Sequence, residues 1–245
     1  MPDPLLPLLD LPGVTAAADA ARAQVDALLG HRMLRRRSAE VSAEAALRGA
    51  RASAALSGHA FTLAEVRDGV DDPVVQGALR VASGLGQLVD VVDRAPLQAL
   101  ARLHALAARG LVADDALGRP LPGSGVRLAA LADLLASRTA GSALLLGAVV
   151  HGEVLALDAF GAASGVVARA AHRLVLVARG LDPKAVTAPD VGHLELVDDY
   201  AVAARAYADG DVGPWVVHCC EAVRLGALDS VAVCEALLRD AESRA

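Results

Sequence analysis

Residues 158–169 of the chain read DAFGAASGVVAR and lie between two stretches that are rich in helix-forming residues. One stretch, Leu144 to Leu157, leads into this segment, and the other, Val166 to Arg179, leads out of it. The residues between them are small, and Gly165 stands where the second helix is expected to start. Because the first N–H groups of a helix lack partners within it and lie at the positive end of its dipole, this arrangement is typical of an anion-binding helix start.

The composition of the chain favours a helical fold. Its 245 residues suffice for one large domain or two small ones. Hydrophobic residues make up 55% of the chain and aromatic residues only 2%, so the core must be built from Ala, Leu and Val. Alanine and leucine favour helix, and small side chains allow helices to approach closely. We therefore expect an all-α protein, a multi-helix bundle without a central sheet.

Charge and residue usage argue against several classes of partner. The formal net charge of −6, with two Phe, two Tyr and one Trp, disfavours a nucleic-acid binder, which normally has a basic face and aromatic rings that stack on bases. Charges such as Asp158 and Arg169 interrupt the apolar runs before they reach the roughly 20 residues of a membrane span. Three cysteines, an odd number, fit a reducing compartment. We expect a soluble cytoplasmic protein with no nucleic-acid and no membrane partner.

Prolines, glycines and apolar periodicity divide the chain into expected elements. Residues 1–13 contain four prolines and are expected to form an extended N-terminal arm. The glycines and prolines of residues 114–126 predict a loop, with at most a short β-hairpin near 117–128. Asp229 is expected to cap the last helix. Helices are predicted at about 14–29, 33–56, 73–92, 97–108, from 128 onward, 143–157, 166–179, 192–207, 215–225 and 230–242. The whole chain, 1–245, is predicted to form a single helical domain, with C-terminal helices over about 192–245.

The segment from Asp158 to Arg169 resembles the signature loop of the Fic (Fido) family, His-Pro-Phe-x-x-Gly-Asn-Gly-Arg-x-x-Arg. Phe160, Gly165 and Arg169 match this pattern at the aromatic position, the last glycine and the second arginine. The resemblance covers about residues 40–185 and implies a helical core with the motif loop between two helices. It also implies a target-docking flap upstream of the motif and, in active members, transfer of AMP to a target hydroxyl.

Several functional positions of the family motif are changed in this sequence. The histidine that takes a proton from the target corresponds to Asp158, and a carboxylate of ordinary pKa is a weaker base. The acidic magnesium-binding position corresponds to Ala162, which cannot coordinate metal. The Gly-Asn pair corresponds to Ala163 and Ser164, and the first, phosphate-binding arginine to Val166. The resemblance therefore implies that the chemistry has been lost, and we expect no catalytic residue, no cofactor and no metal.

Many family members also carry an inhibitory helix with the motif Ser/Thr-x-x-x-Glu-Gly/Asn. Residues Ser53–Gly58 resemble it, with Ser57 in the place of the glutamate. In the family this glutamate pairs with the second motif arginine, which corresponds to Arg169. Because Ser57 has no charge, the resemblance implies a free Arg169 guanidinium. With Ser164 and Gly165 at the helix start, Arg169 is expected to bind phosphate, sulfate or a nucleotide weakly.

Other polar residues have ordinary interpretations. His151 lies two helical turns, roughly 10 Å, before Asp158, so a histidine without catalytic duty is the preferred interpretation. Arg169, His172 and Arg173 share a helix face, which is interpreted as a solvated face with ion pairs; an anion site is the alternative. A further set of His and Cys residues comprises His218, Cys219, Cys220 and Cys234. Adjacent ligands chelate one metal poorly, so this set is expected to be buried thiols in helix packing.

The leading prediction is a degenerate Fic-like protein without AMP transfer that acts as a binding or regulatory module for an unidentified protein partner. Its recognition surface would comprise the motif loop, the loop from Gly118 to Gly125 and the helix face of Arg169. One alternative is a divergent transferase that uses a nucleotide or another phosphorylated donor. A second alternative is a structural subunit that binds elsewhere, for example on the helices after Trp215. The Ala- and Leu-rich helical surface is also compatible with a homodimer.

Overall fold

The structure of the protein, a computed structural model, describes residues 3–137, 139 and 142–243. Within these residues the architecture consists of helices and loops, and the only β-type pairing is an isolated bridge between Arg109 and Val112. The all-α prediction is therefore confirmed. Residues 1–2 of the expected N-terminal arm lie outside the described residues. No helix in the described part of the chain combines the length and the apolar character that crossing a membrane requires.

The elements follow the chain from a short N-terminal 3₁₀ helix to a long C-terminal α-helix. The α-helices are α1 (Val14–Leu29), α2 (Ser38–Leu56), α3 (Leu63–Asp68), α4 (Pro73–Gly84), α5 (Val89–Arg94), α6 (Pro96–Ala108), α7 (Gly125–Ala136), α8 (Ala143–Ala156), α9 (Ser164–Ala178), α10 (Pro189–Glu195), α11 (Val197–Ala208) and α12 (Val212–Glu242). The 3₁₀ helices are η1 (Leu6–Asp10), η2 (Arg32–Arg35), η3 (Leu85–Leu88), η4 (Asp114–Ala116) and η5 (Gly161–Ala163). Most of these positions agree with the helical periodicity of the sequence.

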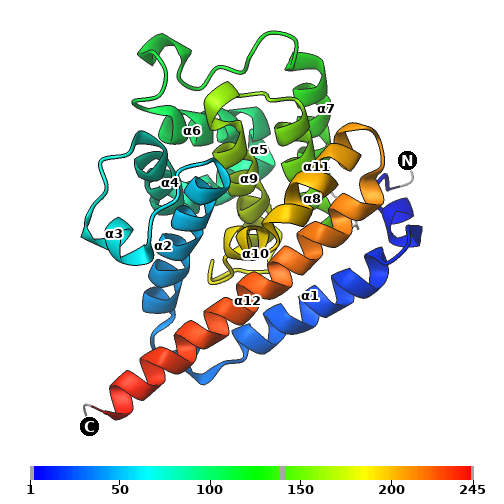
Figure 1. Cartoon of the computed structure of the whole chain (residues 1–245). Helices are drawn as coiled ribbons and strands as arrows, with labels where there is room; N and C mark the ends of the chain where they lie inside the picture. Colours follow the sequence, from blue (N-terminus) through cyan, green and yellow to red (C-terminus); the bar gives the residue numbers. More distant parts are fainter. Residues whose placement is uncertain (1–2, 138, 140–141, 244–245) are drawn as a thin grey trace.

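Helices α8 and α9 form the centre of the bundle, and the motif loop joins them (Figure 1). The Leu145, Leu146 and Val150 side chains of α8 are fully buried, as expected for a helix that is apolar on every side. Helices α2, α4, α5 and α6 pack against α9, while α7, α11 and α12 pack against α8. The motif loop is therefore held at one end of the two most buried helices of the molecule.

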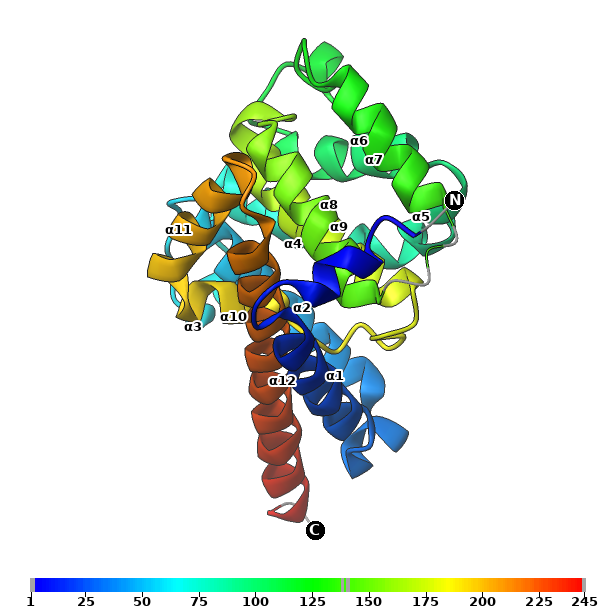
Figure 2. The same cartoon turned by 90° about the vertical axis from the view of Figure 1, so that its right-hand side faces the viewer.

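Helix α12 runs along one side of the molecule with α1 beside it, and both extend beyond the rest of the bundle (Figure 1, Figure 2). The prediction of two helices here, with Asp229 as an N-cap, is wrong. Gly226 lies inside α12 and lets it approach α10 closely, because a Cβ at this position would lie 2.3 Å from the carbonyl oxygen of Ala188. The Asp229 carboxylate instead accepts a hydrogen bond from Nε of Arg48 in α2 at 2.7 Å.

Three other expected elements differ from the structure. The N-terminal arm is not extended, because η1 forms next to Leu5, which is buried in the core. The expected helix over 192–207 is interrupted at Leu196, whose ψ of 34° separates α10 from α11. The expected helix over 73–92 is divided into α4, η3 and α5. No strand forms over 117–128, which are described throughout: this part of the chain is a loop followed by the start of α7.

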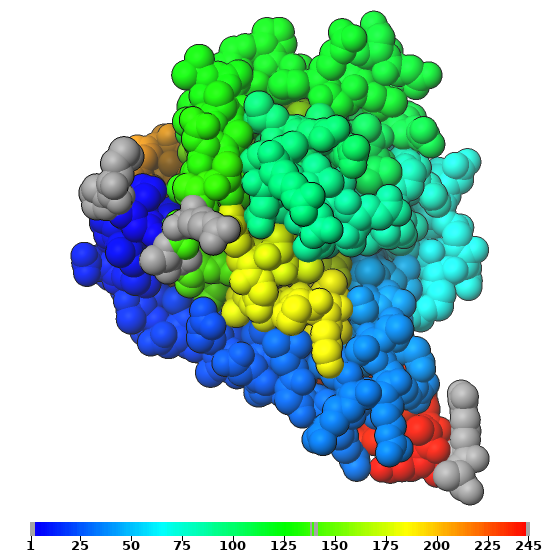
Figure 3. Space-filling view, turned by 180° about the vertical axis from the view of Figure 1, so that it is seen from behind, coloured from blue at the N-terminus to red at the C-terminus, as the bar shows by residue number. Residues whose placement is uncertain are grey.

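The connection between α9 and α10 is packed into the back of the molecule, where it appears in yellow between the blue N-terminal segments and the green helices (Figure 3). Lys184 Nζ donates to the carbonyl oxygen of Leu34 at 2.9 Å. The carbonyl oxygen of Ala185 accepts from Arg173 Nη2 at 2.9 Å and from Ser42 Oγ at 3.2 Å. These bonds fix the start of α10 against α2 and α9, and α10 carries two of the buried polar residues described below.

Candidate functional site

Residues 158–165 join α8 to α9 as a tight loop that is closed by its own hydrogen bonds. Asp158 is exposed and adopts φ 44°, a conformation that is uncommon for a residue other than glycine. Phe160 is 4% exposed and anchors the loop in the core. The backbone N–H of Phe160 donates to Ser164 Oγ at 2.8 Å. The hydroxyl of Ser164, which corresponds to the asparagine of the family motif, thus accepts a hydrogen bond from within the loop.

The loop that follows η4 lies directly on the motif loop. The backbone N–H of Leu121 donates to the carbonyl oxygen of Ala159 at 2.8 Å. At the other end of this loop, the N–H of Gly118 donates to His104 Nδ1 of α6 at 3.1 Å. The His104 ring lies 4.8 Å from the Phe160 ring, centroid to centroid. The backbone N–H groups of Gly118 and Leu121, near the two ends of this loop, therefore already have partners within the protein.

The guanidinium of Arg169 is buried, 3% exposed, and all its nitrogens have partners. Its Nε donates to Ser53 Oγ at 2.8 Å, and its Nη2 donates to the carbonyl oxygen of Ser53 and to Ser57 Oγ, both at 2.7 Å. Its Nη1 donates to the Tyr200 hydroxyl at 3.2 Å, and an Asp190 carboxylate oxygen lies 3.8 Å from Nε. The expectation of a free guanidinium is wrong, because an uncharged serine hydroxyl can also accept a hydrogen bond from it.

The helix face of Arg169, His172 and Arg173 is not solvated. Their exposed fractions are 3%, 1% and 5%, so the interpretation as a solvated face is also wrong. Helices α2, α4, α8 and α10 all pack against α9 and cover this face. The spacing indicated correctly that the three residues share a face, but spacing alone does not reveal whether water or protein covers it.

Gly165 permits the close approach between the helix start and this arginine. A Cβ at Gly165 would lie 3.1 Å from Nη1 and 3.2 Å from Nη2 of Arg169. Ser164 is 3% exposed, and its hydroxyl already accepts a bond from Phe160. Anion binding by Ser164, Gly165 and Arg169 stays a prediction, and the two polar side chains of this set already have protein partners.

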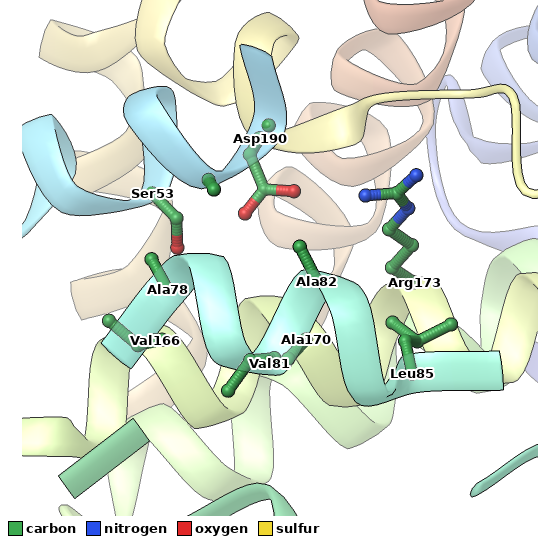
Figure 4. Close-up of a pocket in the computed structure, with 11 residues that line it drawn as sticks. Ser53, Ala78, Val81, Ala82, Leu85, Val166, Ala170, Arg173 and Asp190 are labelled. Atoms are coloured by element: carbon green, nitrogen blue, oxygen red, sulfur yellow. The ribbon is translucent and has the colours of Figure 1, made fainter. Parts of the chain in front are cut away.

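A small cavity lies beside this arginine, between α2, α4 and α9 (Figure 4). Its volume is about 20 Å³, and its lining includes Val166, Ser53, Arg173 and Asp190. Figure 4 shows the polar groups of Ser53, Asp190 and Arg173 on one side and the apolar residues of α4 on the other. Burial raises the pKa of Asp190, and the nearby arginines Arg169 and Arg173 oppose this effect. Such a cavity has room for a water molecule, whereas ligand pockets of drug-like size occupy roughly 300–1,000 Å³.

The comparison with solved structures identifies the fold. A Fic family protein from Desulfovibrio desulfuricans G20 superposes on this chain with a TM-score of 0.75 and 21% sequence identity, covering 91% of this chain and 75% of that chain. The chain has the Fic fold. No protein-family model matches the sequence, and no curated protein matches it either. The Fic likeness thus lies in the backbone arrangement and extends well beyond the expected core of residues 40–185.

Within this Fic fold, the residues at the motif loop do not fit the magnesium ion and nucleotide that the resemblance implies. Ala162 offers only a methyl group where a metal ligand is required. Val166, in place of the phosphate-binding arginine, is 4% exposed and lies in the wall of the 20 Å³ cavity. Three neighbours of this region were not predicted from the sequence: Tyr200 and Asp190 lie beside Arg169, and His104 lies beside Phe160. No local pattern could have revealed them, because each comes from a different, distant helix.

Proposed function

We propose that this Fic-fold protein does not transfer nucleotides and acts instead as a binding module for a protein partner. The proposal rests mainly on Arg169, since its guanidinium donates hydrogen bonds to Ser53 and Ser57 and is buried inside the protein. Asp158 and Ala162 support the proposal further, because they stand in place of the general base and of the metal ligand. A general base contributes a factor of roughly 10² to 10⁴ in rate, and electrostatic stabilisers a comparable factor, so their combined absence leaves little turnover.

The surface best suited to a partner lies at the loop that covers the motif and at the start of α7. Leu121 is 47% exposed and Val126 is 85% exposed, although both are large apolar residues. Asp158 and Ala162 of the motif loop are also exposed, and the hydrogen bond between Leu121 and Ala159 joins this loop to the one that contains Leu121. Exposed apolar residues that cluster and have a polar rim are typical of interaction sites. We therefore assign the partner to this surface, which we call the loop surface (Leu121, Val126, Asp158 and Ala162).

A site-specific photocrosslinker tests this assignment. The crosslinker is placed at Val126 in one variant and at Val202 of α11, also a valine and 65% exposed, in a matched control. We expect a discrete crosslinked complex from position 126 that is absent from position 202 and is lost when Leu121→Asp is added. Complexes formed equally from both positions, or only from position 202, would contradict the assignment and favour a structural subunit that binds elsewhere.

A further inference from the structure

Four buried metal-ligand side chains from four helices meet in the core, apart from the motif loop. They are His151 of α8, His172 of α9, His193 of α10 and Cys219 of α12, with exposed fractions of 0%, 1%, 0% and 1%. One ligand atom from each lies within 4.8 Å of the ligand atoms of the others. These helices are neighbours: α8 packs against α9 and α12, and α10 packs against α12 and α9 (Figure 1). We call these four residues the His₃Cys cluster.

Within the described residues, several ring nitrogens of the cluster have no hydrogen-bond partner. These are Nδ1 of His151, both nitrogens of His172 and Nε2 of His193. A buried polar atom left without a partner costs about 1–3 kcal/mol, and native proteins contain few of them. Several unpartnered nitrogens that lie together therefore indicate that a further group belongs between them.

The remaining nitrogens of two of these histidines do have partners. Nε2 of His151 lies 2.9 Å from the Tyr200 hydroxyl, and Nδ1 of His193 lies 3.0 Å from Nε2 of His218. In each of these two histidines, one ring nitrogen thus lies beside a neighbouring polar side chain and the other has no partner among the described residues. Metal-binding histidines have this arrangement, because an outer hydrogen bond fixes the nitrogen that does not bind the metal.

The backbone makes room for this arrangement. A Cβ at Gly147 of α8 would lie 2.5 Å from Cδ2 and 3.1 Å from Nε2 of His172. A tetrahedral zinc site has bonds of about 2.0–2.3 Å, so its donor atoms lie roughly 3.3–3.6 Å apart. The ligand atoms of the cluster lie within 4.8 Å of one another and therefore need to close by at most about 1.5 Å, which rotations of the side chains provide.

We propose that His151, His172, His193 and Cys219 bind one Zn²⁺ ion in a closed, four-coordinate structural site. Three imidazole nitrogens and one thiolate form a donor set that suits zinc, and four protein ligands leave no position for substrate. The ion would tie α8, α9, α10 and α12 together at the centre of the fold. This site is independent of the proposed function, because none of the four ligands belongs to the motif loop or the loop surface.

The protonation states of the ligands agree with such a site. Burial lowers the pKa of His172 to about 3 and lowers that of His151 and His193 in the same direction, so each imidazole is neutral and can coordinate. Burial raises the pKa of the Cys219 thiol. The thiol therefore keeps its proton until zinc binds; coordination then displaces this proton to solvent, and one Zn–S bond forms as one S–H bond breaks.

The His and Cys residues that the sequence offered as metal ligands were His218, Cys219, Cys220 and Cys234, and they were expected to be buried without a metal. The structure places His218 beside His193, where it would orient a ligand, and leaves Cys220 outside the cluster. Cys219 and Cys220 are both buried, at 1% and 0% exposed. They therefore form a matched pair for a test, because only one of them belongs to the cluster.

The test uses the full chain, once as isolated after growth with zinc and once after unfolding with a chelator and refolding with zinc chloride alone. We expect one equivalent of zinc in the wild type and in Cys220→Ser, and less than a tenth of an equivalent in Cys219→Ser. At zinc concentrations about 100 times Kd, the wild-type Tm should rise by roughly 5–10 °C over the chelated protein. Circular dichroism of each variant establishes that it is folded.

Cobalt provides a second readout that does not depend on stability. Co²⁺ in the wild type should show the visible absorption of a tetrahedral centre together with a thiolate-to-cobalt charge-transfer band. The charge-transfer band should disappear in Cys219→Ser and persist in Cys220→Ser. Substoichiometric zinc in the wild type, or equal zinc and an unchanged cobalt spectrum in both variants, would overturn the proposal.

Discussion

The guanidinium of Arg169 binds oxygen atoms from the C-terminal end of α2 and from Tyr200 of α11. Ser53 supplies both its hydroxyl and its carbonyl oxygen, and Ser57 and Tyr200 supply their hydroxyls. The planar fork of arginine reaches all four oxygens at once, whereas an ammonium group has three donors on a flexible chain. The second motif arginine is thus retained in the sequence, and in the structure it has a role in packing.

Arg169→Lys should therefore cost about 2–4 kcal/mol of unfolding free energy, because at least one buried oxygen loses its donor and the ammonium is buried with poor geometry. Arg224→Lys is the matched control, since Arg224 is bonded at the surface to Glu221 and should change stability by less than about 1 kcal/mol. Urea unfolding of both variants measures the difference. Equal stability of the two variants would show that the Arg169 contacts are unimportant.

At the same scale, motif spacing predicted part of the site. Phe160, which matches the aromatic position of the motif, is buried. Ser53 and Ser57, in the segment that resembles the inhibitory motif, pack against Arg169. What failed was the inference from missing charge to a free guanidinium. A hydroxyl needs no charge to accept a hydrogen bond, and Tyr200 lies too far along the chain for any local pattern to include it.

Elements whose limits depend on local chemistry were predicted well. Asp72 accepts bonds from the N–H groups of Val74 and Val75 and starts α4 at Pro73, as the sequence indicated. The boundaries that failed depend on contacts between helices. Glycine is a common helix end in sequence, yet Gly226 lies within α12 because it permits contact with α10.

Close contact between α10 and α12 makes two glycines irreplaceable. A Cβ at Gly192 would lie 2.1 Å from the carbonyl oxygen of Ala222, and a Cβ at Gly226 would lie 2.3 Å from that of Ala188. We expect each Gly→Ala change to cost more than about 2 kcal/mol through overpacking against backbone. Gly86→Ala, at a site with no atom within 4 Å of the new Cβ, should stay within about 1 kcal/mol of the wild type.

Urea unfolding of these three glycine variants measures the effect. If Gly192→Ala and Gly226→Ala unfold at the same urea concentration as Gly86→Ala, the two helices are not in the close contact described.

The loop that contains Gly118 and Leu121 should lose its hydrogen bond to His104 more readily as the pH falls. Burial lowers the pKa of His104, whose Nδ1 accepts the Gly118 N–H. A group with a lowered folded-state pKa stabilises the fold fully above its unfolded pKa, about 6.5, and loses this contribution as the pH falls towards the folded value. Between about pH 7.5 and 5.5 the protection factor of the Gly118 amide should drop by up to roughly tenfold.

Hydrogen exchange, corrected for the intrinsic pH dependence of the rate, measures this change. His104→Asn retains an acceptor without a titrating ring, so its protection at Gly118 should not vary over this pH range. A pH-independent Gly118 amide in the wild type would contradict the role given to His104.

For the molecule as a whole, composition and periodicity predicted the all-α class, and the resemblance of residues 158–169 to the Fic motif predicted the Fic-like arrangement. Neither could predict which polar residues lie inside. Arg169, His172 and Arg173 were placed on a solvated face and are buried, because burial is decided by the helices that pack on α9. For the same reason, the His₃Cys cluster combines residues from four helices and has no signature in the sequence.

The central claim is that the Fic fold is retained here without nucleotide transfer. The most direct test incubates the full chain with labelled ATP, magnesium and a cell lysate, and measures label transferred to protein. We predict no labelling above that of a reaction without the protein, and no change when Asp158→Ala is used. Robust labelling that requires both the protein and magnesium, and that Asp158→Ala abolishes, would contradict the account.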